Sequence, residues 1–399
     1  MTQTNFNRTD NVFTLQLPGS DLVFTRYLYV KDEVRLALLQ SILSGDCNAA
    51  LFWGYELFCS GFKHEFFNLI WKIYYDFFAT SNSFFETYLM KFHADWLNEG
   101  CVQDSVVSCV IENLLLNKQF NCDIFYLRTI CDKFEIETPS INTIDAFRVH
   151  FKKWIEEKDY RTMTQWLLNI KDNEFKIKDI YESILDVVGV ESKLTKSKVV
   201  KLLEMMPINV NCNLILLVHV MRLFTTQNNK IKKNKNIVIE FDDEDTIEYQ
   251  TICVSDCLKH YQVLEKACKF EIDEFKYLSL FKLNRLKYDL RDKYFNNWLY
   301  HASFSPIWYQ RIKDYKGYPD FTKQIIKFRE EPDDDLMQQF HQLFGMEPDE
   351  QKLTTQEKSI QEIKKINNWT KFNEKFNKNS AFEIYEEELE ELDSCTIVY

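Results

Sequence analysis

The amino-acid sequence predicts a mainly α-helical protein, an irregular multi-helix bundle with one or two small β-hairpins and an acidic C-terminal tail. Only 8 glycines and 7 prolines occur in 399 residues, too few for an all-β fold, which needs a turn about every 8–12 residues. Apolar residues recur at every third or fourth position along most of the chain, which is the period of an amphipathic helix. The breaks between these stretches are short, so consecutive helices should pack as antiparallel neighbours.

Residues 1–30 have the pattern of an N-terminal β-hairpin. Side chains alternate in the manner of a strand from Val12 to Leu17 and again from Leu22 to Val30, and the intervening Pro18–Asp21 has the composition of a turn. We expect two short paired strands in this part of the chain.

Residues 31–206 form the predicted helical domain. Asp32 and Asp46 are expected at the N-termini of its first two helices, because an aspartate side chain can accept hydrogen bonds from free backbone N–H groups. Gly45 and Gly61 follow the apolar repeats and are expected to end these helices, since glycine adopts the left-handed backbone of a helix C-terminus at little cost.

Small side chains in the second of these helices, Ala49, Ala50 and Gly54, should let a neighbouring helix approach closely. Glu65–Phe78 is apolar nearly all round and must be buried on most sides. Further helices are predicted near residues 81–97, 102–117, 122–134, 143–157, 160–170, 174–188 and 195–206.

Pro207 interrupts this series and begins a second helical region, residues 207–329. A helix is predicted at Leu214–Phe224, and long helices resume from about 256 to 300. Between them, two short apolar runs at 237–241 and 247–254 flank four acidic residues, a pattern compatible with a second small hairpin.

Residues 330–399 are a chemically separate acidic tail. The chain has a net charge of -12, of which this tail, with 18 acidic and 7 basic residues, contributes -11. Acidic blocks interspersed with apolar residues are typical of segments that fold on a partner, so we expect a partly helical or mobile interaction tail. The alternative is a tail that only increases solubility. The expected partner-binding residues are Leu336, Phe340, Leu343, Phe344, Glu347 and Asp349.

The positions of the eight glycines exclude several classes of enzyme. No two glycines are separated by a single residue, and none precedes a lysine, so the chain lacks both a dinucleotide fingerprint and a P-loop. No serine lies in a G-x-S-x-G elbow. The N-terminus lacks the pattern of a secretion signal and no apolar run is long enough to span a membrane, so we expect an intracellular protein whose 11 cysteines are reduced.

One cluster, Cys253, Cys257, His260 and Cys268, contains metal-binding residue types. The four residues follow one predicted helix, and ligands on one straight helix cannot surround a zinc ion tetrahedrally, so we expect no metal site. His64–Glu65 begins like a zinc-protease motif, but Asn68 occupies the position of the second histidine. No cofactor and no catalytic residue are predicted.

Basic and aromatic residues are interleaved between 271 and 317, and this stretch is the candidate for binding nucleic acid. The cations Lys282, Arg285, Lys287, Arg291 and Lys293 could contact phosphates while the rings stack on bases. The alternative is an amphipathic helix pair with its aromatic residues in the core. Nine basic residues against six acidic ones leave a net charge of only +3, which is low for a nucleic-acid surface.

Two stretches, LSGDCNAALFWGYELFCSGF at 43–62 and FREEPDDDLMQQFHQLFGMEPDEQ at 328–351, resemble an uncharacterised protein family of the large nucleocytoplasmic DNA viruses, the giant viruses. The resemblance implies a viral protein located in the host-cell cytoplasm or virus factory, or in the virion. Residues 44–61 are also similar to the helical collar of clamp-loader ATPases, but the P-loop of such enzymes is missing.

The leading functional hypothesis is a non-enzymatic protein–protein interaction component, structural, assembly or accessory, that binds a viral or host protein through its acidic tail. A nucleic-acid-binding accessory protein is the first alternative. An enzyme without a recognisable local motif is the second, and it would require a cleft in which a histidine or cysteine lies beside a carboxylate. The sequence leaves the oligomeric state open.

Overall fold

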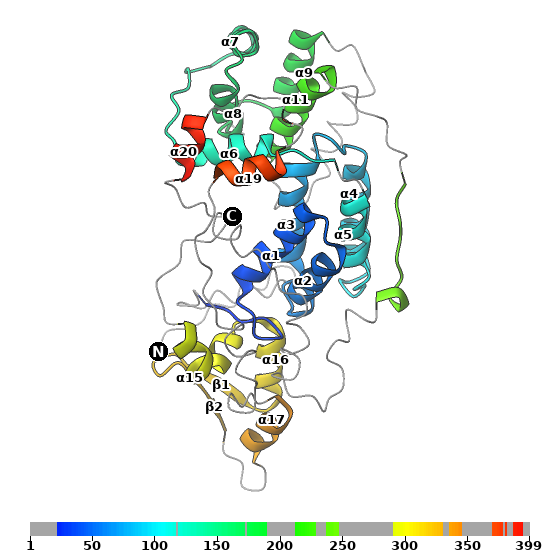
Figure 1. The fold of residues 1–399 in the computed structure, drawn as a ribbon, viewed down its shortest axis with the longest axis vertical. Coiled ribbons are helices and arrows are strands. Elements are labelled where there is room, and N and C mark those ends of the chain that lie inside the picture. Colours follow the sequence, from blue (N-terminus) through cyan, green and yellow to red (C-terminus); the bar gives the residue numbers. More distant parts are fainter. Residues whose placement is uncertain are drawn as a thin grey trace.

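The fold is mainly helical, with one two-stranded antiparallel hairpin among the residues that the computed structural model describes, which confirms the predicted fold class. The described residues are 22–116, 119–171, 174–189, 212–228, 237–246, 290–329, 335–344, 369–377, 380 and 386–393. They form two hydrophobic cores. The main core occupies the upper and middle parts of Figure 1, and the second core lies at the lower end around α15, α16 and α17.

Asp32 does not cap the first helix as predicted: Val30 precedes that helix, no side chain caps its N-terminus, and Asp32 lies within its first turn. The predicted boundary at Gly45 and Asp46 agrees with the structure. α1 (Lys31–Ser44) is followed by Gly45, whose φ of 73° is left-handed. The Asp46 side chain accepts a hydrogen bond from the Ala49 N–H at the start of α2 (Cys47–Cys59). Gly54 lies against α5, where an added Cβ would come within 2.4 Å of Ile111. The predicted close approach of a neighbouring helix is therefore confirmed.

The apolar helix predicted at 65–78 is present, but its last turn is wider than an α-helix. α3 (Lys63–Ile73) continues into η1 (Tyr74–Phe78), a π-helical turn in which the Ala79 N–H donates to the Tyr74 carbonyl. π-Helical turns insert one residue into a helix and change the direction of the side chains around them. Here Tyr75 reaches Glu86, and the next residue, Asp76, reaches Arg128.

The remaining helices of the main core agree with the predicted series. α2 packs against both α1 and α5, α6 packs against α8 and the π-helical turn, and α11 packs against α8 and α9. The predicted helix at 195–206 lies outside the described residues. The bounds are α4 (Phe85–Asn98), α5 (Val106–Leu116), α6 (Asp123–Lys133), α7 (Ile144–Glu157), α8 (Tyr160–Leu168), α9 (Ile177–Val188) and α11 (Cys212–Asn228).

Residues 22–30 do not form the predicted continuous strand; the first strand of that hairpin lies outside the described residues. The chain reverses near Arg26, and a single antiparallel bridge joins Phe24 to Val30. The alternation of side chains is present, but both faces are buried. Leu22, Phe24, Leu28 and Val30 belong to the second core, whereas Val23 and Tyr27 belong to the main core. This segment therefore fills the space between the two cores.

The second core is built on α15 (Leu290–Ala302) and α16 (Pro306–Asp314). The described hairpin follows them: β1 (Gly317–Asp320) pairs with β2 (Ile325–Phe328), with Gly317 opposite Phe328. This hairpin was not predicted, because its strands are only four residues long and β1 contains a proline. Of the helices predicted over 256–300, only α15 lies within the described residues.

Residues 237–246 run beside α4 and α5 (Figure 1). The first arm of the hairpin predicted here is extended, but its hydrogen-bond partners are side chains of α5, and it leads into the 3₁₀ turn η2 (Glu244–Thr246). The predicted return strand at 247–254 lies outside the described residues.

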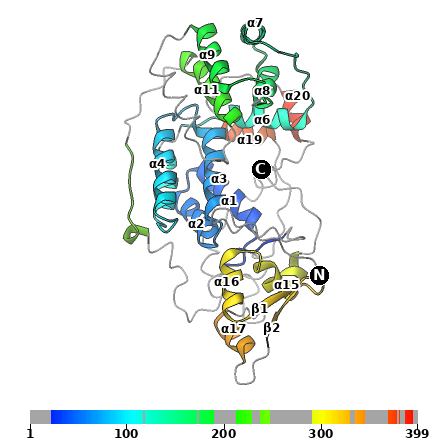
Figure 2. The same ribbon diagram turned by 180° about the vertical axis from the view of Figure 1, so that it is seen from behind.

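The described parts of the acidic tail are helices packed on the rest of the chain. α17 (Leu336–Phe344) joins the second core. α19 (Trp369–Phe376) and α20 (Glu386–Asp393) pack on each other and lie beside α6, below α7 and α9 in the upper part of the views (Figures 1 and 2). Across the described ranges, no helix combines the length and apolar character needed to cross a membrane.

Candidate functional site

The residues predicted to bind a partner on α17 divide between the inside and the outside of the molecule. Phe340 is fully buried against Phe328, Tyr315 and Phe344. Leu336 and Phe344 are half-buried, and Leu343 is 39% exposed. Glu347 and Asp349 lie outside the described residues. The apolar stripe of α17 thus stabilises the protein's own core through its centre, and only its margin faces solvent.

The aromatic residues at the end of the tail are buried as well. Trp369 and Phe372 pack on Phe125 of α6, with ring centroids 5.2 Å and 5.9 Å away, respectively. The Cys122 N–H donates to the Asn377 side-chain oxygen. These tail residues therefore form part of the main core, and α19 carries aromatic residues because it covers α6.

The candidate nucleic-acid stretch is described only from residue 290. Lys282, Arg285 and Lys287 lie outside the described residues, and the Arg291 side chain does too. The Lys293 ammonium donates to the Gln324 side-chain oxygen at 3.0 Å, so it is bound to the tip of the hairpin.

The aromatic residues described in this stretch are mostly core residues. Tyr294 and Trp308 are fully enclosed, and Trp298 and Tyr300 are buried beside them. Trp298 and Trp308 pack edge to face with centroids 5.4 Å apart. Buried rings cannot stack on bases, so the described aromatic residues agree with the amphipathic-helix alternative.

The hairpin presents a different group of exposed rings. Tyr318 and Ile325 lie on its outer face, 46% and 37% exposed, and Phe321 at its tip is 48% exposed. We call these three residues the hairpin face. The inner face, which carries Ile326 and Phe328, packs on the second core. Because all three side chains of the hairpin face are more than a third exposed, this face is the candidate site for a partner.

The edges of this hairpin are protected from strand pairing. Pro319 in β1 has no N–H group to offer. At the start of β2, the Asn297 amide of α15 donates to the Gln324 carbonyl at 3.0 Å. A partner would therefore contact the hairpin face through side chains.

The interior holds the residue combination that the enzyme alternative requires. His219 Nε2 lies 3.2 Å from Glu86 Oε1, and the Tyr75 hydroxyl donates to the same oxygen at 3.0 Å. Burial raises the pKa of Glu86, but His219, Tyr75 and Arg222 together outweigh it, so the pKa of this carboxyl is below its usual value. All three residues of the triad are at most 5% exposed. A substrate cannot reach them, so the triad acts as a hydrogen-bonded link between α4, α11 and the π-helical turn.

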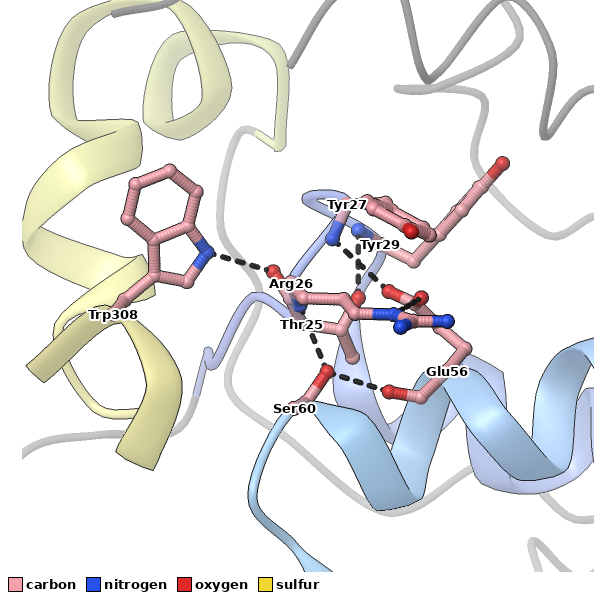
Figure 3. Close-up of polar contacts among 7 residues, drawn as sticks. All are labelled: Thr25, Arg26, Tyr27, Tyr29, Glu56, Ser60 and Trp308. Carbon is pink, nitrogen blue, oxygen red and sulfur yellow. Dashed lines mark hydrogen bonds and ion pairs between the residues drawn. The ribbon is translucent and has the colours of Figure 1, made fainter. Parts of the chain in front are cut away.

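A second buried charged group lies where residues 22–30 meet α2 and α16 (Figure 3). The Arg26 guanidinium donates to Glu56 Oε2 at 2.8 Å, and the Tyr27 N–H donates to Glu56 Oε1 at 3.0 Å. The Trp308 indole N–H donates to the Thr25 carbonyl at 3.0 Å. The Glu56 side chain is fully buried. This group joins the two cores and is structural.

Metal-binding geometry is not found in the part of the chain that the structure describes, which contains no group of three or more histidine, cysteine or carboxylate side chains able to hold an ion. Cys253, Cys257, His260 and Cys268 all lie outside that part.

Comparison with known proteins found no match among protein-family models, curated proteins or solved structures. The class that the fold itself defines is a mainly helical protein whose described residues form two hydrophobic cores.

Proposed function

We propose that the protein is a non-enzymatic interaction component that binds a protein partner on the hairpin face, Tyr318, Phe321 and Ile325. The observation that carries the proposal is the exposure of these three large apolar side chains within eight residues of one small hairpin. Exposed apolar groups of this kind mark interaction sites when they cluster, whereas single ones need no explanation.

The charge around the hairpin face defines the chemistry of the partner. Residues 313–329 contain five cations and two carboxylates, and Lys316, Lys323 and Arg329 are exposed. Rings and an aliphatic side chain bordered by cations fit a segment that combines carboxylates with an apolar stripe. We therefore assign an acidic amphipathic segment of a partner protein as the occupant.

A nucleic acid is the competing occupant, because two exposed rings beside lysines could also stack on bases. The hairpin face favours protein, since one of its three exposed side chains, Ile325, is aliphatic and offers no ring on which a base could stack.

The test uses a labelled synthetic peptide of residues 382–393, an acidic segment from this chain with an apolar stripe, as a model ligand, and oligo-dT as the nucleic-acid probe. The triple variant Tyr318→Ser, Phe321→Ser and Ile325→Thr removes the hairpin face. The matched control is Val102→Ser with Val149→Ser, two residues that are 73% and 70% exposed elsewhere on the surface.

We expect the wild type and the control to bind the peptide and the triple variant to bind it at least tenfold more weakly, which is about 1.4 kcal/mol. Equal binding by all three proteins, or no binding by the wild type, would overturn the proposal. Binding of oligo-dT with steep salt dependence, and no binding of the peptide, would replace it with the nucleic-acid alternative.

The resemblance of residues 43–62 and 328–351 to giant-virus proteins motivates the proposal that the partner is viral or belongs to the host, in the cytoplasm or virus factory of an infected cell. Fluorescent tagging in an infected cell tests the location, and a diffuse signal that never concentrates at the factory would contradict it.

A further inference from the structure

The extended segment 237–243 is held by a ladder of hydrogen bonds from one helix. At the first rung, the Asn113 amide donates to the Ile239 carbonyl at 2.6 Å and accepts from the Ile239 N–H at 2.9 Å. At the second, Cys109 Sγ accepts from the Phe241 N–H at 3.2 Å and donates to its carbonyl at 3.5 Å. At the third, the Ser105 N–H donates to an Asp243 carboxylate oxygen at 2.8 Å.

The three sets of hydrogen bonds stay in register because four residues along the helix and two residues along the extended segment cover nearly the same distance. Four residues of an α-helix rise about 6.0 Å, and two residues of an extended chain rise about 6.6 Å. Positions 113, 109 and 105 therefore stay level with 239, 241 and 243, and the segment runs antiparallel to α5. Side chains of a helix thus take the place of a neighbouring β-strand.

The first two rungs recognise backbone, and the third recognises a carboxylate. Asn113 and Cys109 contact only main-chain atoms of the segment, so they do not require particular side chains there. Burial raises the pKa of the Cys109 thiol, which keeps its proton available for the carbonyl. Ser105 directly precedes α5, where free N–H groups and the helix dipole favour an anion. The aspartate at position 243 is therefore the side chain of the segment that this site selects.

Neighbouring side chains anchor the segment without changing this pattern. Val238 and Phe241 pack against the main core, and Thr246 is 1% exposed. The Lys91–Glu240 ion pair, by contrast, is exposed on both sides and contributes little.

We infer that the outer face of α5 is a peptide-binding site for an extended segment of a partner protein with an aspartate at its third rung, and that residues 237–246 occupy this site in cis. A segment of the same chain competes with a partner segment at an effective concentration that does not depend on the protein concentration. A partner segment of the same pattern therefore binds by exchange and releases the chain's own segment.

The experiment uses a fluorescent peptide of residues 236–247 and the full-length chain with Ile239→Pro and Phe241→Pro, which removes the two N–H donors of the cis segment. We expect the peptide to bind this variant at least tenfold more tightly than the wild type. Adding Asn113→Leu to the variant should weaken binding at least tenfold, and a peptide carrying the same two prolines should not bind.

A second variant keeps the test independent of the prolines. Asp243→Lys changes an exposed residue and weakens only the third rung. We expect iodoacetamide to alkylate Cys109 faster in this variant than in the wild type, and added wild-type peptide to restore the slower rate. Two results would overturn the inference: no protection of Cys109 by the peptide, or peptide binding that is insensitive to Asn113→Leu in a folded chain. Neither result bears on the hairpin face.

Discussion

Removal of one partner of the buried Arg26–Glu56 pair should destabilise the whole protein. The Arg26 side chain is only 7% exposed, and Glu56→Leu removes the carboxylate that pairs with its guanidinium. The same change leaves the Tyr27 N–H without its acceptor. Breaking a buried pair costs about 3–5 kcal/mol, and an unpaired buried N–H adds about 1 kcal/mol. The sum is a large part of the roughly 5–15 kcal/mol that stabilises a typical domain.

The reciprocal variant, Arg26→Met, should cost about 3–5 kcal/mol, because it leaves the carboxylate of Glu56 buried. The double variant replaces the pair by apolar side chains of similar size, and such replacements are often close to neutral. We therefore expect the double variant to be more stable than either single variant, with a coupling free energy of at least about 3 kcal/mol.

Urea unfolding followed by tryptophan fluorescence and far-ultraviolet circular dichroism measures these values. The exposed Lys152–Glu156 pair is the matched control, and Glu156→Ala should change the free energy of unfolding by less than about 0.5 kcal/mol. A coupling free energy below about 0.5 kcal/mol between Arg26 and Glu56, or additive losses in the double variant, would refute the reasoning.

Three further predictions concern other parts of the fold. Burial lowers the pKa values of His93 and His301 to about 4, so between pH 6.5 and 4 the unfolded chain binds more protons than the folded protein. The free energy of unfolding should therefore fall as the pH decreases through this window. A urea midpoint that stays constant across the window would contradict this prediction. Gly61→Ala should lower the free energy of unfolding by about 3 kcal/mol, because φ is 93° and the new Cβ would lie 2.5 Å from the ring of Pro306, the first residue of α16. Gly100 has a φ of 76° and free space around it, so Gly100→Ala should lower the free energy of unfolding by only about 1 kcal/mol. Equal losses in the two variants would argue against the contact with Pro306. Trp369→Ala should cost about 3–5 kcal/mol and accelerate proteolysis of the tail, whereas unchanged unfolding would show that α19 is not part of the core.

Short-range signals predicted the described helices of the main core well. Asp46 and Gly45 mark helix ends because capping depends on neighbouring backbone groups alone, and the predicted helix at 143–157 agrees with α7 because Thr143 caps it in the same way. A stretch that is apolar nearly all round likewise located the buried helix at 65–78, although nothing local distinguishes its π-helical turn.

Predictions that depended on tertiary neighbours were less accurate. The alternation at 22–30 was detected, but a period of two does not reveal that a separate core covers each face. The positions of Phe340 and Leu343 on one apolar stripe could not show which of them the second core would bury. Ser105, Cys109 and Asn113, the first just before α5 and the others on it, recur at intervals of four in a strongly apolar sequence. This spacing was the available signal for the face of α5 that binds residues 237–243.

The placement of residues 22–30 between two cores has a consequence for synthesis of the chain. The Trp308–Thr25 hydrogen bond closes a separation of 283 residues, so the apolar side chains at 22, 24, 28 and 30 leave the ribosome long before α15 and α16 exist to cover them. At about 5–20 residues per second, this interval lasts roughly 15–55 s. During that time these four apolar side chains of the nascent chain lack the core residues that bury them, and any product that ends before α16 leaves them without that cover.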